Sequence, residues 1–312
     1  MRVEPFDVSE AAGQTTLWLD SDRIDACLAY YAAQGIDRLA ISPPRGYRAP
    51  DLTPLRGRPE IRGLTIVSPP AYDFDLTPLV GLPNLRQLIA SFAIHVPLSS
   101  WPGLTMFRGY WSKELRLEEA RALRTLDLSG YKSKSKDLSE LPALPQLVDL
   151  SLIAADITSL HGLAQRLPQL ERLELGYLRA LTSIAEVALL QQLDWLECLV
   201  CRKIGDAAAS LRGHRRLRCV LLNDWRAGRP RLRARDAAAR GASLRGHQRS
   251  RRESDAAFEP QARRLSAQAA LLAQARRAQR ALARLTSATT TSTARETARA
   301  DTSKRARSAP RR

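Results

Sequence analysis

The segment LRTLDL at residues 123–128 decides the fold, because it returns along the chain at a nearly constant interval. Close matches are LVDLSL at 147–152, LERLEL at 170–175 and LDWLEC at 193–198. Each follows the pattern L-x-x-L-x-L, in which the second and third apolar residues are two positions apart. That spacing places both side chains on one face of a β-strand, and the x residue between them on the other face.

Nine segments of the chain follow this pattern. Each has apolar residues at the first two leucine positions and an apolar or small residue at the third. Their first residues are Ile36, Ile61, Leu85, Leu104, Leu123, Leu147, Leu170, Leu193 and Leu217. Six of the eight intervals between them are 23–25 residues long. Between the segments lie short apolar stretches that end at a proline, as in 76–84 and 160–168, and these predict return segments. One unit cannot bury its apolar face alone, so neighbouring units must stack.

In this pattern and its period the chain resembles the bacterial leucine-rich-repeat family over roughly residues 36–225. The resemblance implies an α/β fold, a leucine-rich-repeat solenoid with a curved parallel β-sheet on its concave side and helical or irregular segments on its convex side. Residues 104–122 fit the pattern poorly, which predicts a distortion of the curve there. The resemblance is to an architecture and implies no single activity.

The residues before the repeats predict a cap for the first open edge of the core. The segment at 16–20 reads as a strand, and a helix follows over about 21–34. Asp20 or Ser21 is suited to cap the start of this helix, and Gly35 to end it. A solenoid needs such a cap, because its first unit has no preceding neighbour.

The net charge of +17 is confined to the end of the chain. Residues 1–225 carry 26 Lys and Arg against 26 Asp and Glu, whereas residues 226–312 carry 23 against 6. The latter segment has 22 Arg, 23 Ala and neither Ile nor Val, so we expect it to be disordered, or loosely helical over about 260–285. The predicted organisation is a strand-helix cap at 1–35, a solenoid at 36–225 and a basic tail at 226–312.

Two interpretations of this tail compete. A basic arm could bind nucleic acid, since clustered Arg neutralises phosphate. However, only Phe258 is placed among the arginines for base stacking, which makes nucleic acid an unlikely partner. The composition is also what a GC-rich coding sequence yields out of frame, and we favour a frame alteration near codons 224–227.

Several function classes are disfavoured by composition. No run of 18 apolar residues exists, so no membrane-spanning helix and no membrane partner are expected. The first residues lack the layout of a secretory signal, and four Cys do not make a disulfide framework. The expected location is the cytoplasm, with export as an effector as the alternative.

Catalytic and metal-binding patterns are weak. The motif Cys198-x-x-Cys201, with His214 and Cys219 nearby, suggests zinc, but the repeat accounts for these cysteines. It places Cys198 in the core, Cys201 in a turn and Cys219 in the outward column of the next strand. The four histidines are dispersed, and no Ser/His/Asp order or Gly-rich loop accompanies them. We therefore expect no enzyme activity, no cofactor and no metal.

Binding is expected on the x residues of the pattern, which project from the concave sheet. The candidate partner-binding residues are Asp127, Asp149, Arg172, Glu174, Trp195 and Glu197. They predict an acidic patch with Trp195 as an exposed anchor, suited to a basic surface of another protein. A solvated charged face without a partner is the alternative.

The predicted function is thus a non-catalytic protein–protein interaction scaffold. One alternative, which rests on the family resemblance, is the substrate-recognition part of a secreted bacterial effector of the ubiquitin-ligase type. Another is nucleic-acid binding through the basic tail, which would be strongly salt-dependent.

Overall fold

The computed structural model describes residues 2–3, 6–11, 13–67, 74–212 and 214–223. All of them belong to one compact unit, Met1–Ser243. The expectations for the tail at 226–312, including its disorder and its possible helix, lie outside the described residues.

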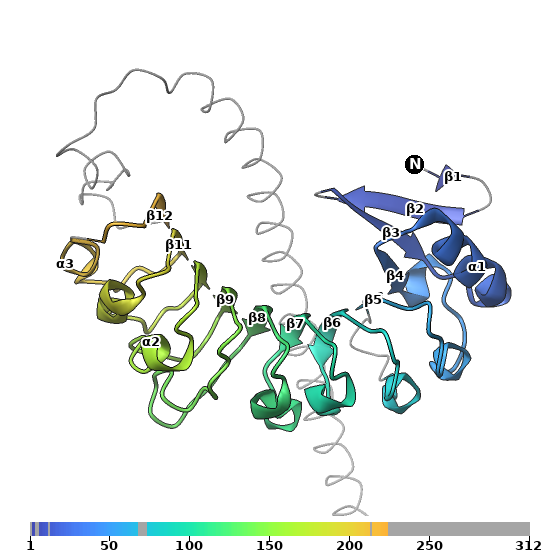
Figure 1. Ribbon diagram of the computed structural model, residues 1–312, viewed down its shortest axis with the longest axis horizontal. Coiled ribbons are helices and arrows are strands. Elements are labelled where there is room, and N and C mark those ends of the chain that lie inside the picture. The colour runs from blue at the N-terminus through green and yellow to red at the C-terminus, as the bar shows by residue number, and fades with distance from the viewer. Residues whose placement is uncertain (1, 4–5, 12, 68–73, 213, 224–312) are drawn as a thin grey trace, which may run out of the picture. The chain divides into compact units, whose positions relative to one another are not determined.

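Within these residues, twelve strands form a single sheet in which neighbours in the sheet are also neighbours in the chain (Figure 1). The first two pairings are antiparallel, and all later ones are parallel. The strands are β1 (Arg2–Val3), β2 (Phe6–Ala11), β3 (Gln14–Trp18), β4 (Arg38–Ile41), β5 (Gly63–Ile66), β6 (Gln87–Ala93), β7 (Met106–Tyr110), β8 (Thr125–Ser129), β9 (Asp149–Ile153), β10 (Arg172–Gly176), β11 (Trp195–Leu199) and β12 (Cys219–Asn223).

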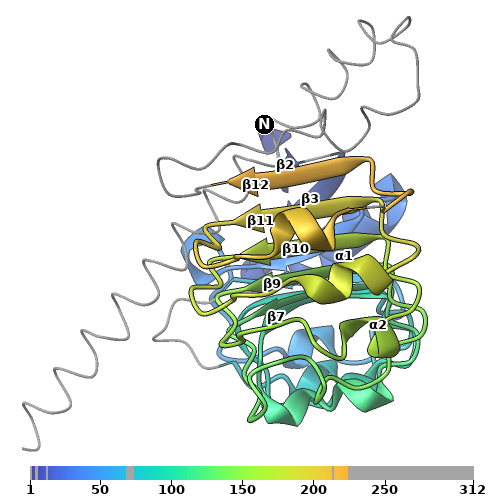
Figure 2. The same cartoon turned by 90° about the vertical axis from the view of Figure 1, so that its left-hand side faces the viewer.

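A continuous column of leucine side chains runs beneath the sheet. Leu126, Leu150, Leu173 and Leu196 are paired in register on β8 to β11, and each is fully buried. This confirms the column that the repeat pattern predicts. Figure 2 shows the later strands stacked one above another. Because side chains alternate along a strand, the residues between the leucines point to the opposite side, here called the strand face.

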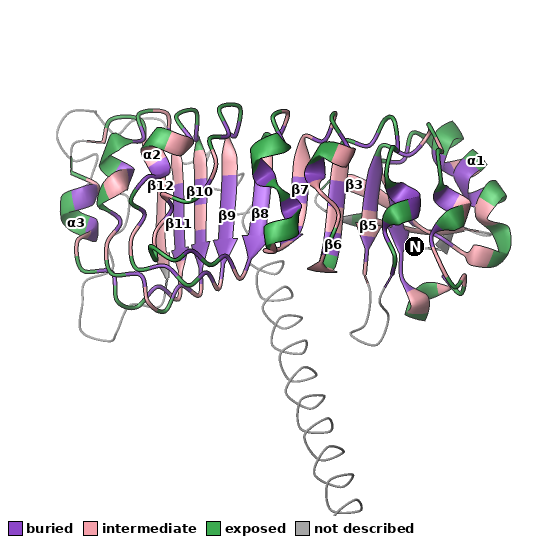
Figure 3. Ribbon diagram, turned by 90° about the horizontal axis from the view of Figure 1, so that it is seen from below, coloured by how far each residue is buried: buried purple, intermediate pink, exposed green. Residues whose placement is uncertain are grey.

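The return segments lie on the other side of the sheet and are built mainly from single turns of 3-10 helix (Figures 1 and 3). Too few residues separate the strands for long α-helices, and short 3-10 turns satisfy such connections. The α-helices are α1 (Ile24–Gln34), α2 (Leu163–Arg166) and α3 (Ala207–Ser210). The 3-10 helices are η1 (Ser21–Arg23), η2 (Pro43–Arg45), η3 (Thr53–Leu55), η4 (Thr77–Leu79), η5 (Leu98–Ser100), η6 (Lys113–Leu115), η7 (Leu117–Glu119) and η8 (Ala185–Leu189).

Two of these turns share the sequence DLTPL, at 51–55 and at 75–79. In each, the Asp carboxylate accepts a hydrogen bond of 2.9 Å from the backbone N–H of the Thr two residues later. The proline then stands at the start of the 3-10 turn, where its missing N–H costs nothing. The turn is therefore encoded locally and repeats with the strands.

At the amino terminus the predicted strand and helix are confirmed as β3 and α1. Asp20 accepts a hydrogen bond from the N–H of Asp22, and Gly35 ends α1 in the left-handed conformation at φ 61°. The structure adds β1 and β2, which the sequence analysis did not predict. The ring of Phe6 in β2 stacks on Tyr30 of α1 at 4.3 Å between centroids, so the hairpin packs on the helix.

The sheet has a register irregularity at the start of residues 104–122, where a distortion of the curve was expected. Pairing of β7 with β8 is regular from Met106 to Tyr110. The register shifts instead between β6 and β7, at Ile89 and Ala93. β6 is longer than β5 and β7, so not all of its residues pair with β7.

Candidate functional site

The strand face carries the predicted binding residues in two adjacent columns. One column holds Arg108, Asp127, Ser151, Glu174 and Glu197, paired in register from β7 to β11. The second column runs beside it. It holds Met106, Thr125, Asp149, Arg172 and Trp195. All six predicted site residues therefore lie on four consecutive strands, on one face.

Four acidic side chains, Asp127, Asp149, Glu174 and Glu197, form what we call the carboxylate cluster. Two arginines balance half of it. Arg108 forms an ion pair with Asp127 on the next strand, and the Nε of Arg172 lies 3.8 Å from Asp149. Arg108 was not among the predicted site residues. Arg108 occupies the same column as Asp127, one repeat earlier, and this position in the repeat could have identified it from the sequence.

Trp195 does not stand as the exposed anchor that the sequence analysis expected. Its side chain is half-buried, and the guanidinium of Arg172 lies over its ring at 4.8 Å from the centroid. Neighbouring residues on β10 and β12 flank it in the sheet. The prediction of an exposed aromatic was therefore wrong. Neighbouring strands of a sheet are only about 4.8 Å apart, so side chains on them cover much of a ring in such a column.

Glu174 and Glu197 have no counter-ion in contact among the residues that the structure describes. Glu197 is only 4% exposed, and no hydrogen bond or ion pair reaches its carboxylate from the described residues. The Oε1 atom of Glu174 is buried and also has no hydrogen-bond partner among them. These two residues face each other across β10 and β11, and so form the part of the carboxylate cluster that the fold leaves unbalanced.

Burial and mutual repulsion weaken the acidity of the cluster. Burial raises the pKa of Glu174 to about 7, and the charges of Asp127, Glu197 and Asp149 act in the same direction, against Arg108. Burial likewise raises the pKa of Asp149 and of Glu197, and Arg172 opposes the shift in both. An approaching cation would favour the ionised carboxylates.

Cys198 lies in the core and Cys201 in the turn after β11, and Cys219 is half-buried on β12 beside Trp195, as the repeat predicts. Cys198 is buried in the column behind the strand face, and the Sγ of Cys201 lies 3.4 Å from the carbonyl oxygen of Leu175. Burial raises the pKa of both thiols. Among the described residues, no three His, Cys, Asp or Glu side chains are grouped in a way that could hold a metal ion.

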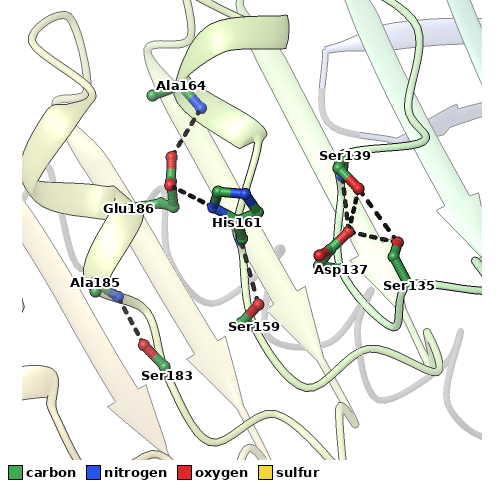
Figure 4. Close-up of polar contacts among 9 residues, drawn as sticks. All are labelled: Ser135, Asp137, Ser139, Ser159, His161, Ala164, Ser183, Ala185 and Glu186. Carbon is green, nitrogen blue, oxygen red and sulfur yellow. Dashed lines mark hydrogen bonds and ion pairs between the residues drawn. The ribbon is translucent and has the colours of Figure 1, made fainter.

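A second group of polar side chains lies in the turns between β8 and β11 (Figure 4). The Oδ1 of Asp137 accepts hydrogen bonds of 2.6 Å from the hydroxyls of Ser135 and Ser139. The Nδ1 of His161 lies 3.3 Å from Glu186 Oε1. Ser, His and carboxylate together are the residue types of nucleophilic catalysis, in which the hydroxyl must bond to the imidazole.

That arrangement does not occur at His161. Its ring contacts Glu186, and the hydroxyls of Ser135 and Ser139 bond to Asp137. The hydroxyl of Ser159 accepts a hydrogen bond of 3.4 Å from the backbone N–H of His161, not from its ring. The carboxylates cap backbone groups instead, because Glu186 also accepts from the N–H of Ala164 and Asp137 from that of Ser139 (Figure 4). These contacts hold successive return segments together.

No helix in the described residues has the length and apolar character needed to cross a bilayer. Comparison with known proteins found no family model that matches the chain and no curated protein that resembles it.

Proposed function

We propose that residues 36–225 form a leucine-rich-repeat solenoid and that the protein is a non-catalytic scaffold, which receives a basic surface of another protein on the strand face. The repeat period of 23–25 residues, the in-register parallel strands and the buried leucine column support the solenoid. Such folds present the strand side as an extended binding surface.

The observation that carries the binding proposal is the imbalance of charge in the carboxylate cluster. Four acidic groups share two arginines, and the two arginines contact Asp127 and Asp149. When ionised, the remaining pair gives this part of the face a negative charge. A positive partner surface would be attracted to it and oriented by it.

The test is crosslinking mass spectrometry of the full chain in its native cell, with two variants. The double variant Trp195→Ala with Glu174→Lys removes the ring and reverses one charge on the strand face. The matched control is Leu189→Ala with Glu118→Lys, two exposed positions in return segments. We expect a specific partner to be lost from the first variant and retained by the control. Equal crosslinking of the partner to both variants would refute binding at this face.

The two alternative functions gain no support from the described residues. Nucleic-acid binding was assigned to the tail at 226–312, which is not described. A ubiquitin-ligase type effector needs a separate domain for its chemistry, and the described residues contribute one sheet and its return segments.

A further inference from the structure

Glu174 and Glu197 occupy equivalent positions on adjacent parallel strands. The register places Glu174 of β10 directly beside Glu197 of β11. Adjacent strands are about 4.8 Å apart, and both side chains project on the strand face. The backbone therefore holds the two glutamate side chains next to each other on the strand face.

The fold does not use this pair. The arginines of the cluster contact other groups: Arg108 pairs with Asp127, while Arg172 lies between Asp149 and the ring of Trp195. Glu197 is 4% exposed and forms no hydrogen bond or ion pair with the described residues, and beside it the Oε1 atom of Glu174 is buried without a hydrogen-bond partner among them. Burying a carboxylate oxygen without a partner is unfavourable, so this pair is suited to accept hydrogen bonds from a ligand.

A ligand that suits this pair is a cation with several hydrogen-bond donors. A divalent metal would need a set of ligands around one point, and no such set occurs among the described residues. A guanidinium is weakly hydrated, which suits a site with little access to water, and its planar fork can donate to two carboxylates at once.

We propose that Glu174 and Glu197 together form a subsite for one arginine side chain of the partner protein. This inference rests on the proposed function, because it names the chemistry by which the strand face recognises a basic surface. The guanidinium donates to both carboxylates and supplies the counter-charge that Arg108 and Arg172 do not.

Binding at this subsite is linked to a proton. At pH 6 much of Glu174 is protonated, since its pKa is about 7, and the protonated carboxyl must release its proton before it can pair with a guanidinium. The charged groups around Glu174 act in two directions. Asp127, Asp149 and Glu197 favour its protonation, and Arg108 opposes it. Arg172 opposes protonation of Glu197, and the Cys219 thiol next to Glu197 has a pKa raised by burial, so it stays neutral at these pH values. Affinity for arginine should rise about tenfold from pH 6 to pH 8, the change in the ionised fraction of one such group.

The experiment titrates the full chain with N-acetyl-arginine amide, monitored by NMR, at pH 6 and pH 8. N-acetyl-citrulline amide, which has the same shape without the charge, and N-acetyl-lysine amide are the comparison probes. The variants are Glu174→Gln and Glu197→Gln. Their matched control is Glu118→Gln, which removes the same charge from an exposed return segment. Circular dichroism establishes that each variant is folded.

The proposal expects saturable binding of the arginine probe, at least tenfold weaker in both site variants and unchanged in the control. It also expects weaker binding of lysine, no binding of citrulline, and loss of the pH dependence in Glu174→Gln. Absence of saturable arginine binding to the folded protein overturns the subsite. Lysine binding as tight as arginine, or displacement of arginine by equimolar calcium, overturns the assignment of the ligand.

These outcomes are separable from those that test the proposed function. If the partner is captured through the strand face but the arginine probe does not bind, the subsite is wrong and the scaffold role stands. If arginine binds but the strand-face variant captures the partner normally, the scaffold role at this face is wrong.

Discussion

The guanidinium carbon of Arg172 lies 4.8 Å from the centre of the Trp195 ring on the neighbouring strand. The same side chain approaches Asp149 on the opposite strand, so one arginine ties three strands together across the strand face. It also covers the ring of Trp195. The charge and the ring on this face are therefore held in place by contacts within the sheet.

Replacing Arg172 by Gln should remove both interactions. An exposed cation–π contact and a solvent-accessible ion pair each contribute about 0.5–1 kcal/mol, so we expect a loss of about 1–2 kcal/mol in the free energy of unfolding. Urea denaturation measures it. Arg179→Gln is the matched control, because Arg179 is exposed in a return segment, and it should change stability by less than about 0.5 kcal/mol. Equal losses in the two variants would contradict the role given to Arg172.

The raised pKa of Glu174 makes stability depend on pH in a defined direction. Its folded pKa of about 7 lies above the unfolded value, so the unfolded state loses this proton first as the pH rises. The free energy of unfolding should therefore fall between about pH 5 and pH 8, by up to about 3 kcal/mol for this group alone. Asp149 and Glu197, with pKa values raised in the same way, add to the fall.

Glu174→Gln should remove the contribution of this group. We expect the variant to be more stable than the parent protein at pH 8, with the difference shrinking toward pH 5, where the parent carboxyl is protonated. Urea denaturation at four pH values between 5 and 8 tests this. Glu171→Gln, which changes an exposed carboxyl just before β10, should follow the parent protein throughout. A stability difference for Glu174→Gln that is the same at pH 5 and pH 8 would show that titration of Glu174 is not its cause.

Much of the strand face could be predicted from the sequence because the repeat fixes it. Once Leu126 and Leu150 are equivalent, the residues between the leucines must lie in columns, and the register confirms both columns. The identity of the contacts could not be predicted in this way. Arg172 can reach Asp149, Trp195 or solvent from the same backbone position, and only the packing of neighbouring side chains selects among them.

Strands β1 and β2, which were not predicted, lie outside the repeat. β2 pairs with β3 through a tight hairpin, and no other segment of the chain resembles it. The alternation of apolar and polar residues in β2 is short, and Phe6 and Val8 are its apolar residues that pack on the core. The register shift at Ile89 was likewise invisible, because it depends on how two neighbouring strands of unequal length share hydrogen bonds.

The leucine column should dominate stability. Leu150 is fully buried between Leu126 and Leu173, and Leu150→Ala would leave a cavity that stacked neighbours cannot fill. We expect a loss of about 3 kcal/mol in the free energy of unfolding, measured in urea. Leu189→Ala makes the same chemical change at a side chain that is 61% exposed, and its effect should be below about 0.5 kcal/mol. A cost for Leu150→Ala similar to that of Leu189→Ala would mean that the column is not a packed core.

A recurring backbone strain follows β9, β10 and β11. Ala154, Tyr177 and Val200 occupy equivalent positions just beyond these strands and have φ values of 53°, 59° and 59°. Gly130 holds the corresponding position after β8, at φ 76°. In three of the four units, the first N–H past the strand donates to the next unit, as from Ala154 to Gly176 and from Tyr177 to Leu199. The left-handed conformation turns the chain out of the sheet while this hydrogen bond is kept.

Val200 is the least suited of these residues to the left-handed backbone conformation, because a β-branched side chain is strongly disfavoured at positive φ. Val200→Gly should relieve this strain and raise the free energy of unfolding by about 1 kcal/mol, less the greater chain entropy of glycine in the unfolded state. The control, Ala188→Gly, places glycine in η8, where φ is not positive, and should lower stability by about 0.5–1 kcal/mol. Opposite signs in urea denaturation of the two variants would establish that the turn after β11 is held in an unfavourable conformation by the stacking of the units. Destabilisation by both would instead show that the side chain of Val200 contributes more through packing than it costs in strain.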